Sequence, residues 1–312
     1  MKLPSCLAVL IFTVAVNFSA KADMLVSGFS SDAVHRFSSS GASLGVFATH
    51  STMDGPTALV YNSAGELLVL NTFSLNVLRF DGASGAYLGT LITPTSLGSV
   101  GLTDPNDMEL GPDGNLYMMS HHNDGANIFK FDSLTGAYLG IFAASPPVRH
   151  QHGLAFGSGG HLYQGNVATG YVERFDGVTG AFMGVFTGGP PIGSIGDLIF
   201  GPSHLYVASE GAGGVARYDA SSGTFLGYLI PAGSSHWGMT IDGGVLYVSN
   251  VTSGEIRKYD TATDAYLGSF ISTGPGAADL LAMPVPEPAS AAMVLAGLAL
   301  VVRRRRGSNT RR

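Results

Sequence analysis

The chain has 312 residues, of which 12% are charged and 44 are glycine. Between residues 23 and 284 there are 8 Lys and Arg against 21 Asp and Glu, which gives this stretch a net charge of −13. Because so acidic a surface repels phosphate backbones, nucleic-acid binding is not expected. The only cysteine is Cys6, so the rest of the chain has no disulfide or thiolate chemistry.

Residues 1–22 have the pattern of a secretory signal peptide. Lys2 supplies the positive start, Leu7 to Val16 form a largely apolar core, and Ala20-Lys21-Ala22 is a small-x-small cleavage site. We therefore expect an exported protein whose mature chain lacks cysteine.

One motif recurs six times through the body of the chain. Its clearest copy runs from Arg79 to Gly89, with the sequence Arg-Phe-Asp-Gly-Ala-Ser-Gly-Ala-Tyr-Leu-Gly. The lead aromatic residues of the six copies are Phe37, Phe80, Phe131, Phe175, Tyr218 and Tyr259, at spacings of 43, 51, 44, 43 and 41 residues. A period of about 40–50 residues is typical of a four-stranded propeller blade.

Each copy of the motif is expected to form a hairpin. The Asp that ends its first strand can bond the turn backbone, and the turn Gly adopts a positive φ without steric cost. Two further apolar stretches precede each hairpin, for example Ala58 to Tyr61 and Leu67 to Leu70. Two stretches and one hairpin make four strands per repeat. The sequence thus predicts an all-β, six-bladed β-propeller over residues 23–284, with the lead Arg or Lys of each motif pairing or stacking locally.

The two ends of the body predict how the ring closes. The first unit begins at Met24-Leu25-Val26, which matches the second strand of a blade. A stretch that matches the missing inner strand, Asp279-Leu280-Leu281, follows the sixth hairpin. We expect residues 277–283 to complete the N-terminal blade and remove an open edge, giving a monomer. The body resembles NHL-repeat and SMP-30-like six-bladed propellers over about residues 23–284.

Candidate site residues gather at the predicted channel mouth, where inner strands begin and second strands end. Alignment of the repeats places there Asp107, Asp197, Asp279, Asn71, Asn166, Glu210, Asn250, His121, His122, His150, His152, His236 and Trp237. The three aspartates fall on alternating blades, and three carboxylates with nearby oxygens could hold Ca²⁺. The alternative is a polar, water-filled channel whose aspartates bond neighbouring backbone amides.

The histidines and the tryptophan allow further interpretations. His150-x-His152 places two imidazoles on one side of an extended segment, and His121, His122 or His236 could complete a transition-metal shell. Rim histidines could instead act as acid or base in a propeller lyase, or simply be solvated. Trp237, the only tryptophan, could stack on a sugar or pack as an ordinary aromatic residue.

Residues 285–312 contain three parts in a fixed order. Pro286-Glu287-Pro288 is followed by an apolar segment, residues 289–302, and then by Arg303, Arg304, Arg305 and Arg306. This end resembles the PEP-CTERM sorting signal of Gram-negative bacteria. The resemblance implies processing by an exosortase and a final place in the cell envelope, at the outer surface or in an exopolysaccharide or biofilm matrix.

The apolar segment 289–302 is expected to form a short hydrophobic helix that inserts transiently into the inner membrane. It is shorter than the ~20 residues that a stable span needs, and the arginines favour the cytoplasmic side. A plain single-pass anchor is the alternative.

No Gly-x-Ser-x-Gly, P-loop, His-Glu-x-x-His or EF-hand motif is present in the sequence. The sequence therefore favours a non-enzymatic binding or scaffold module that contacts exopolysaccharide or envelope proteins. The resemblance to SMP-30-like hydrolases implies an alternative, a metal-dependent lactonase or esterase with Ca²⁺ or another divalent cation at the channel mouth, although the chain has no clear match to that family's full ligand set. A propeller lyase and a purely structural matrix component complete the set of interpretations.

Overall fold

The computed structural model of the chain describes residues 22–120, 127–144, 151–211, 213–272 and 277–284. The sorting signal with its hydrophobic helix, and all but the last residue of the signal peptide, lie outside these ranges. So do three of the candidate site residues, His121, His122 and His150. Within the described ranges, no helix combines the length and the apolar character that crossing a membrane requires.

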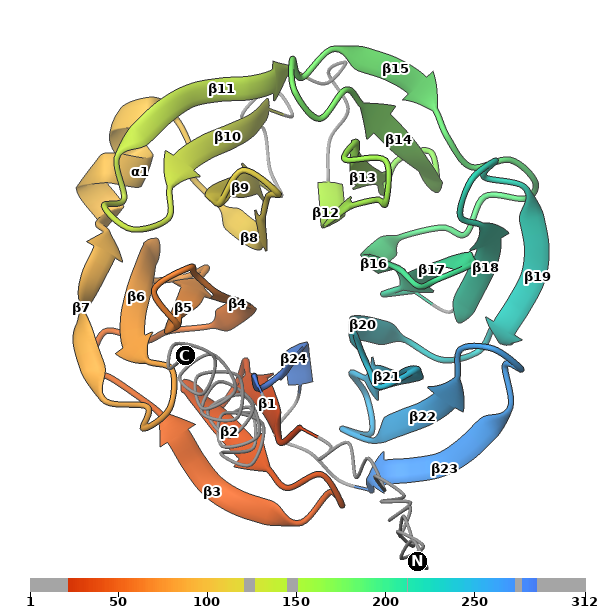
Figure 1. The fold of residues 1–312 in the computed structure, drawn as a ribbon, viewed down its shortest axis with the longest axis horizontal. Coiled ribbons are helices and arrows are strands. Elements are labelled where there is room, and N and C mark those ends of the chain that lie inside the picture. Colours follow the sequence, from red (N-terminus) through yellow and green to blue (C-terminus); the bar gives the residue numbers. More distant parts are fainter. Residues whose placement is uncertain (1–21, 121–126, 145–150, 212, 273–276, 285–312) are drawn as a thin grey trace, which may run out of the picture. The chain divides into compact units, whose positions relative to one another are not determined.

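Residues 22–284 fold into six four-stranded antiparallel sheets around a central axis, as predicted (Figure 1). From the axis outward, blade 1 contains β24 (Ala277–Ala282), β1 (Met24–Gly28), β2 (Ala33–Phe37) and β3 (Ser43–Ala48). Blade 2 contains β4 (Pro56–Tyr61), β5 (Glu66–Asn71), β6 (Asn76–Asp81) and β7 (Tyr87–Ile92). Blade 3 contains β8 (Pro105–Leu110), β9 (Asn115–Ser120), β10 (Asn127–Asp132) and β11 (Tyr138–Ala144).

The second half of the ring repeats this order. Blade 4 contains β12 (Gln151–Phe156), β13 (Leu162–Asn166), β14 (Tyr171–Phe175) and β15 (Phe182–Val185). Blade 5 contains β16 (Ile195–Phe200), β17 (His204–Ser209), β18 (Val215–Asp219) and β19 (Phe225–Ile230). Blade 6 contains β20 (His236–Asp242), β21 (Val245–Asn250), β22 (Ile256–Asp260) and β23 (Tyr266–Ile271).

The ring closes through its last strand. β24 pairs antiparallel with β1, and Met24 lies opposite Ala282 in the register. The predicted closure by residues 277–283 is therefore confirmed. Blade 1 combines the two ends of the propeller, so β1 is paired along both of its edges.

The recurrent motif forms a hairpin whose turn is fixed by its Asp and Gly. In blade 2, Oδ1 of Asp81 accepts hydrogen bonds from the backbone amide and the hydroxyl of Ser84, at 2.8 and 2.6 Å. Gly85 has a φ of +73°, and a Cβ there would lie 1.9 Å from the carbonyl oxygen of Phe47 in the preceding blade. Only glycine fits this close approach. The lead aromatic, Phe80, is fully buried.

The lead basic residue of the motif forms local ion pairs, as expected. Nη2 of Arg36 lies 2.7 Å from Oδ2 of Asp23, and Nζ of Lys130 lies 2.7 Å from Oδ2 of Asp113. These pairs are partly exposed, so each contributes at most about 1 kcal/mol to stability.

The hydrophobic core lies between neighbouring blades. Leu68, Leu70 and Val77 of blade 2, for example, pack with Leu116 and Phe131 of blade 3, and all five side chains are fully buried. Burial of one such side chain contributes roughly 1.5–3 kcal/mol. Packing between blades therefore fixes the radial order of the strands and the residues that face the axis.

One short helix, α1 (Pro94–Val100), lies in the connection between blades 2 and 3. The hydroxyl of Thr93 caps its first turn by accepting a hydrogen bond from the amide of Ser96, at 3.2 Å. Leu97 is buried in the core that the two blades share. The longest spacing between motif copies thus corresponds to an inserted helix.

Candidate functional site

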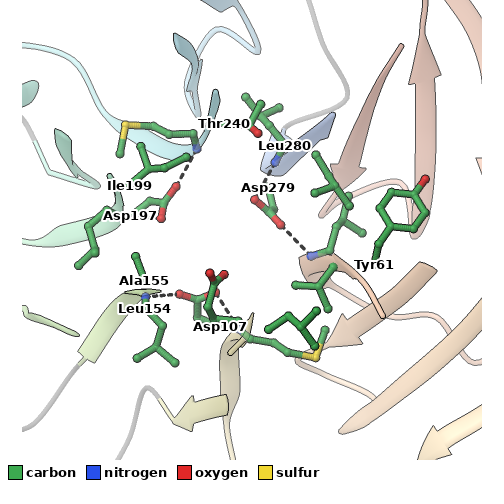
Figure 2. A pocket seen from close by; sticks show the side chains of 17 residues that line it. Tyr61, Asp107, Leu154, Ala155, Asp197, Ile199, Thr240, Asp279 and Leu280 are labelled. Atoms are coloured by element: carbon green, nitrogen blue, oxygen red, sulfur yellow. Dashed lines mark hydrogen bonds between the residues drawn. The ribbon is translucent and has the colours of Figure 1, made fainter. Parts of the chain in front are cut away.

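Three aspartates point toward the axis from alternating blades. Asp279 lies on β24, Asp107 on β8 and Asp197 on β16, the innermost strands of blades 1, 3 and 5 (Figure 2). The pairing of each of these strands with its second strand shifts register at this position. Such a bulge re-aims a side chain, here toward the channel. The predicted alternation of the aspartates is confirmed.

Each carboxylate joins its own blade to the next one. Oδ1 accepts a hydrogen bond from the amide of the following residue: Met108 at 2.7 Å, Leu198 at 2.6 Å and Leu280 at 2.7 Å. Oδ2 accepts one from the inner strand of the next blade: Leu154 at 2.6 Å, Met239 at 2.7 Å and Leu59 at 2.7 Å. The three aspartates therefore act as staples between blades 1 and 2, 3 and 4, and 5 and 6.

The blades that supply these amides have a small residue just before each donor. Ala58, Gly153 and Gly238 precede Leu59, Leu154 and Met239. A Cβ on Gly153 would lie 3.0 Å from the amide nitrogen of Leu198, and its φ of +75° favours glycine. The alternation of Asp with Ala or Gly along the repeats is therefore the sequence signature of the staples.

The three carboxyl groups have raised pKa values. Each side chain is partly exposed to the channel and is otherwise surrounded by protein. Burial is the main cause for each, and it raises the pKa of Asp279 to about 8 together with the charge of Asp107. Burial and then the charges of Asp107 and Asp279 raise the pKa of Asp197 well above its usual value. The backbone bonds act in the opposite direction, and His152 also lowers the pKa of Asp107. At neutral pH the carboxyl of Asp279 is therefore largely protonated.

On one side of the aspartates the channel widens into a cavity of about 370 Å³. Its walls combine apolar side chains, among them Ala155 and Ile199, with the carboxyls of the aspartates (Figure 2). Glu109 of β8 also lines it, and burial followed by the charges of Asp107 and Asp279 raises the pKa of this carboxyl to about 8. Glu109 was missed by the sequence analysis. Its position two residues after Asp107 on the same strand is the signal that places both side chains on the channel side.

The aspartates do not fit a calcium site as they stand. Both oxygens of each carboxylate already accept a backbone hydrogen bond. Among the described residues, no group of three or more His, Cys, Asp or Glu side chains is placed to hold a metal ion. The alternative that the sequence left open, aspartates bonded to neighbouring amides, is the arrangement observed.

On the other side of the aspartates lies a small polar pocket at the mouth, referred to below as the mouth pocket. Thr57, Asn106, His152 and Trp237 line it together with the three carboxyls, and its volume is about 20 Å³. A cavity of this size holds about one water molecule. The aspartates therefore separate a wide channel cavity from a narrow mouth.

A histidine and a carboxylate meet beside the mouth pocket. Nδ1 of His152 on β12 lies 2.8 Å from Oε1 of Glu210, which follows β17 in the next blade. His152 is buried, and Glu210 is partly exposed. The rings of His152 and Trp237 have centroids 6.3 Å apart. The structure thus brings together three residues that the sequence could place only on the same rim.

Other predicted mouth residues have structural contacts. His236 is fully buried, with Nε2 2.8 Å from the hydroxyl of Ser234 and Nδ1 3.0 Å from the carbonyl oxygen of Ser249, and burial lowers its pKa. It is not placed with His152 in a metal shell within the described ranges. The amide of Asn166 donates to Glu173 at 2.9 Å.

The other two predicted asparagines are also engaged inside the rim. The side chain of Asn71 donates to Val69 and Asn76, at 3.1 and 2.9 Å. Oδ1 of Asn250 accepts bonds from two amides of the turn that follows it. Both side chains are buried, so they support the rim turns.

Two aromatic residues that the sequence analysis did not select extend from Trp237. The rings of Trp237 and Phe29 are 5.5 Å apart, and those of Phe29 and Phe73 are 5.2 Å apart. Phe29 follows β1 and Phe73 follows β5, so both lie at the rim where second strands end. We call Phe73, Phe29 and Trp237 the aromatic row. Phe29 and Phe73 come from turns that differ between repeats, which is why the motif alignment did not find them.

A polar cleft of about 600 Å³ lies at the rim of blades 5 and 6. Glu210, Ser234, Ser235, Asn250, Glu255 and Arg257 are among its lining residues. Nε of Arg257 lies 2.8 Å from Oε2 of Glu255, which leaves little net charge from this pair. Glu210 belongs both to this cleft and to the contact with His152, so the two features are continuous.

No family model matches the chain, and no curated protein matches it. A chain of a nidogen/laminin complex superposes with a TM-score of 0.67 at 12% identity, covering 84% of this chain and 98% of that chain. A gluconolactonase from Xanthomonas campestris gives a TM-score of 0.56 at 17% identity, over 72% and 78%. A catalytically inactive histidine-to-alanine variant of virginiamycin B lyase from Staphylococcus aureus, with quinupristin, gives 0.55 at 16% identity, over 75% and 79%. Identities this low show a shared six-bladed propeller fold and nothing more specific.

Proposed function

We propose that this protein is a hydrolase that cleaves an ester or lactone bond at the channel mouth, by acid–base chemistry centred on His152. The contact of 2.8 Å between His152 and Glu210 carries the proposal. A carboxylate that orients an imidazole beside a pocket with room for one water is the arrangement that general-base hydrolysis needs. The proposal replaces the binding module as the preferred function, and the gluconolactonase and lyase among the structural neighbours support it by analogy.

In this mechanism the carboxylate of Glu210, 2.8 Å from Nδ1 of His152, favours the tautomer with the proton on Nδ1 and so leaves Nε2 as the acceptor. Nε2 takes a proton from the water in the mouth pocket. The resulting hydroxide adds to the carbonyl carbon, and the carbonyl oxygen becomes an oxyanion. Collapse of this intermediate breaks the bond to the alcohol oxygen, which takes the proton back from His152. The acid and the alcohol leave, and the imidazole returns to its starting state.

The aspartates supply the acid side of the site. Burial raises the pKa of Asp279, which lines the mouth pocket with His152, to about 8, so at neutral pH this carboxyl is largely protonated and can donate a hydrogen bond. A neutral acid in a water-poor pocket can stabilise a developing oxyanion. The burial of the carboxyls destabilises the fold, but in this mechanism it helps to stabilise the oxyanion. No step of this mechanism passes through a metal ion, because the described carboxylates do not fit one.

The direct test is a substrate screen of the full-length protein against sugar lactones and aryl esters, followed by titration of the acid released. We expect His152→Gln to lower kcat by about 10²–10⁴-fold, the usual contribution of a general base. His161→Gln is a matched control, because Nδ1 of His161 lies 3.9 Å from Oδ2 of Asp176 in a turn outside the mouth. Equal activity of the His152 variant and the wild type would overturn the proposal.

We also propose that the protein is exported and sorted by an exosortase to the envelope or matrix. The order of Pro286-Glu287-Pro288, residues 289–302 and the four arginines from Arg303 supports this. In a host with an exosortase, replacing the three residues of the motif by alanine should leave the C-terminal segment attached, which mass spectrometry of the envelope fraction would detect. Normal removal of the segment from the variant would contradict it.

A further inference from the structure

The aromatic row is held in place by its supporting turns. The amide of Phe73 donates to the carbonyl oxygen of Asp54 at 3.2 Å, and the amide of Gly55 donates to Oδ1 of Asp32 at 3.0 Å. These bonds tie the turn that carries Phe73 to the turn that follows Phe29. A Cβ on Gly55 would lie 2.7 Å from the ring of Phe73, so this glycine makes room for the ring. The row is therefore a built surface, although Phe73 is 61% exposed.

The polar cleft continues the surface from the other side of His152. Its lining offers the exposed hydroxyls of Thr252 and Ser253 beside the partly exposed Ser234 and Ser235. Arg257 and Glu255 neutralise one another. The cleft therefore offers many neutral donors and acceptors, which suit a ligand with many hydroxyl groups.

The aromatic row and the polar cleft can contact different parts of one ligand. An apolar face of the ligand can stack on the row, and hydroxyl groups at its edge can form hydrogen bonds in the cleft. Sugar rings combine both, because their C–H faces are apolar and their edges carry hydroxyls. The net charge of −13 between residues 23 and 284 disfavours an anionic glycan. The extent of the surface, over blades 1, 2, 5 and 6, suits a chain of sugars rather than one ring.

We propose that the mouth face binds a neutral polysaccharide, with sugar rings stacked on Phe73, Phe29 and Trp237 and hydroxyls bonded in the polar cleft. The chain passes beside His152. This inference rests on the proposed function in one respect only: the ester that is cleaved is a substituent of this polysaccharide.

Trp237 is the only tryptophan of the chain, so its fluorescence reports on this surface alone. The full-length His152→Gln variant is titrated with cello-oligosaccharides, dextran and galactomannan, and with polygalacturonate as the anionic counterpart. We expect a saturable change of the emission with at least one neutral glycan and none with polygalacturonate. A change with polygalacturonate alone, or with none of the three neutral glycans, would overturn the proposal.

Affinity electrophoresis in gels that contain the bound glycan tests the row itself. Phe73→Ala should weaken binding about tenfold, as for other exposed aromatic anchors. Phe182→Ala is the matched control, because Phe182 is 44% exposed on the outer strand β15. Equal retardation of the two variants would refute a role of the row. Because Phe73 is exposed, its removal leaves folding intact, and near-UV circular dichroism confirms this.

Binding and catalysis fail separately in these experiments. Glycan binding that persists in His152→Gln without any ester cleavage by the wild type would overturn the proposed hydrolase and retain the glycan surface. Ester cleavage by the wild type without binding of any neutral glycan would overturn the glycan surface and retain the proposed hydrolase.

Discussion

Oδ2 of Asp279 accepts a hydrogen bond of 2.7 Å from the amide of Leu59, 220 residues earlier in the chain. Asp279 lies on the closing strand of blade 1, and Leu59 lies on the inner strand of blade 2. One side chain thus seals the ring twice, through its own strand and through the next blade. Asp107 and Asp197 repeat the contact at equivalent places. The channel carboxyls therefore have a structural role, which is to join neighbouring blades.

The staples make a prediction for stability. Asp197→Ala removes the acceptor of two buried amides, those of Leu198 and Met239. We expect the free energy of unfolding at pH 5 to fall by about 1–3 kcal/mol, the usual cost of stranding buried polar groups. Urea unfolding followed by circular dichroism measures it. Asp54→Ala, at an exposed position, should have little effect. If the two variants match, the staple contributes nothing.

The same carboxyls predict an unusual dependence of stability on pH. Burial raises the folded-state pKa of Glu109 and Asp279 to about 8, whereas unfolded carboxyls titrate near pH 4. Between these values the folded state holds protons that the unfolded state has lost. Stability should therefore fall as pH rises, by about 1.4 kcal/mol per pH unit for each retained proton, until the folded groups ionise.

The cleanest window for this measurement is pH 7 to 8. Burial lowers the pKa of His35 and His236, so these residues oppose the trend only at lower pH, where the unfolded chain protonates them. Urea midpoints across the window should decrease for the wild type and decrease less for Glu109→Gln. A midpoint that stays constant or rises in the wild type would contradict the raised carboxyl pKa values.

The contact between His152 and Glu210 predicts a kinetic effect at a distance from the substrate. Glu210→Gln keeps a hydrogen-bond acceptor for Nδ1 but removes the charge that stabilises the imidazolium. We expect kcat to fall by about 10²-fold or more with a smaller change of KM, because positioning of the base matters in the transition state. Steady-state kinetics on the substrate found in the screen measures both constants. A change confined to KM would assign Glu210 to substrate binding instead.

Calcium and chelators should have little effect on the folded protein. Over the described part of the chain, no cluster of three or more His, Cys, Asp or Glu side chains is placed to hold a metal ion. The thermal midpoint with millimolar CaCl₂ should equal the midpoint with EDTA. A ligand that binds the native state stabilises it by an amount that grows with the logarithm of its concentration over Kd, so a clear rise of the midpoint with CaCl₂ would establish a calcium site.

Most of the fold could be predicted from the six repeats, as the residues at the closure of the ring show. The phase of the motif required an inner strand for blade 1, and Asp279-Leu280-Leu281 was the stretch in the right place. The same alignment placed Asp107, Asp197 and Asp279 on alternating blades. These inferences need only the order of strands within a blade, which the period fixes.

The contacts between side chains could not be predicted in the same way. His152 and Glu210 belong to different blades, and their approach depends on the length of the turn after β17 as well as on the register of the sheet. Glu109 was hidden because Ile199 and Leu281 occupy the equivalent positions, so the repeat indicated an apolar residue. The aromatic row depends on Phe29 and Phe73, which lie in turns that follow no common pattern.

The pairing of β24 with β1 also sets an order of events while the chain is made. Met24 to Ala48 are synthesised long before Ala277 to Ala282. The inner edge of β1 therefore stays unpaired for most of the time that the chain is being synthesised. A strand in this state can pair with another chain. A chain that ends before Ala282 would therefore keep the open edge of β1.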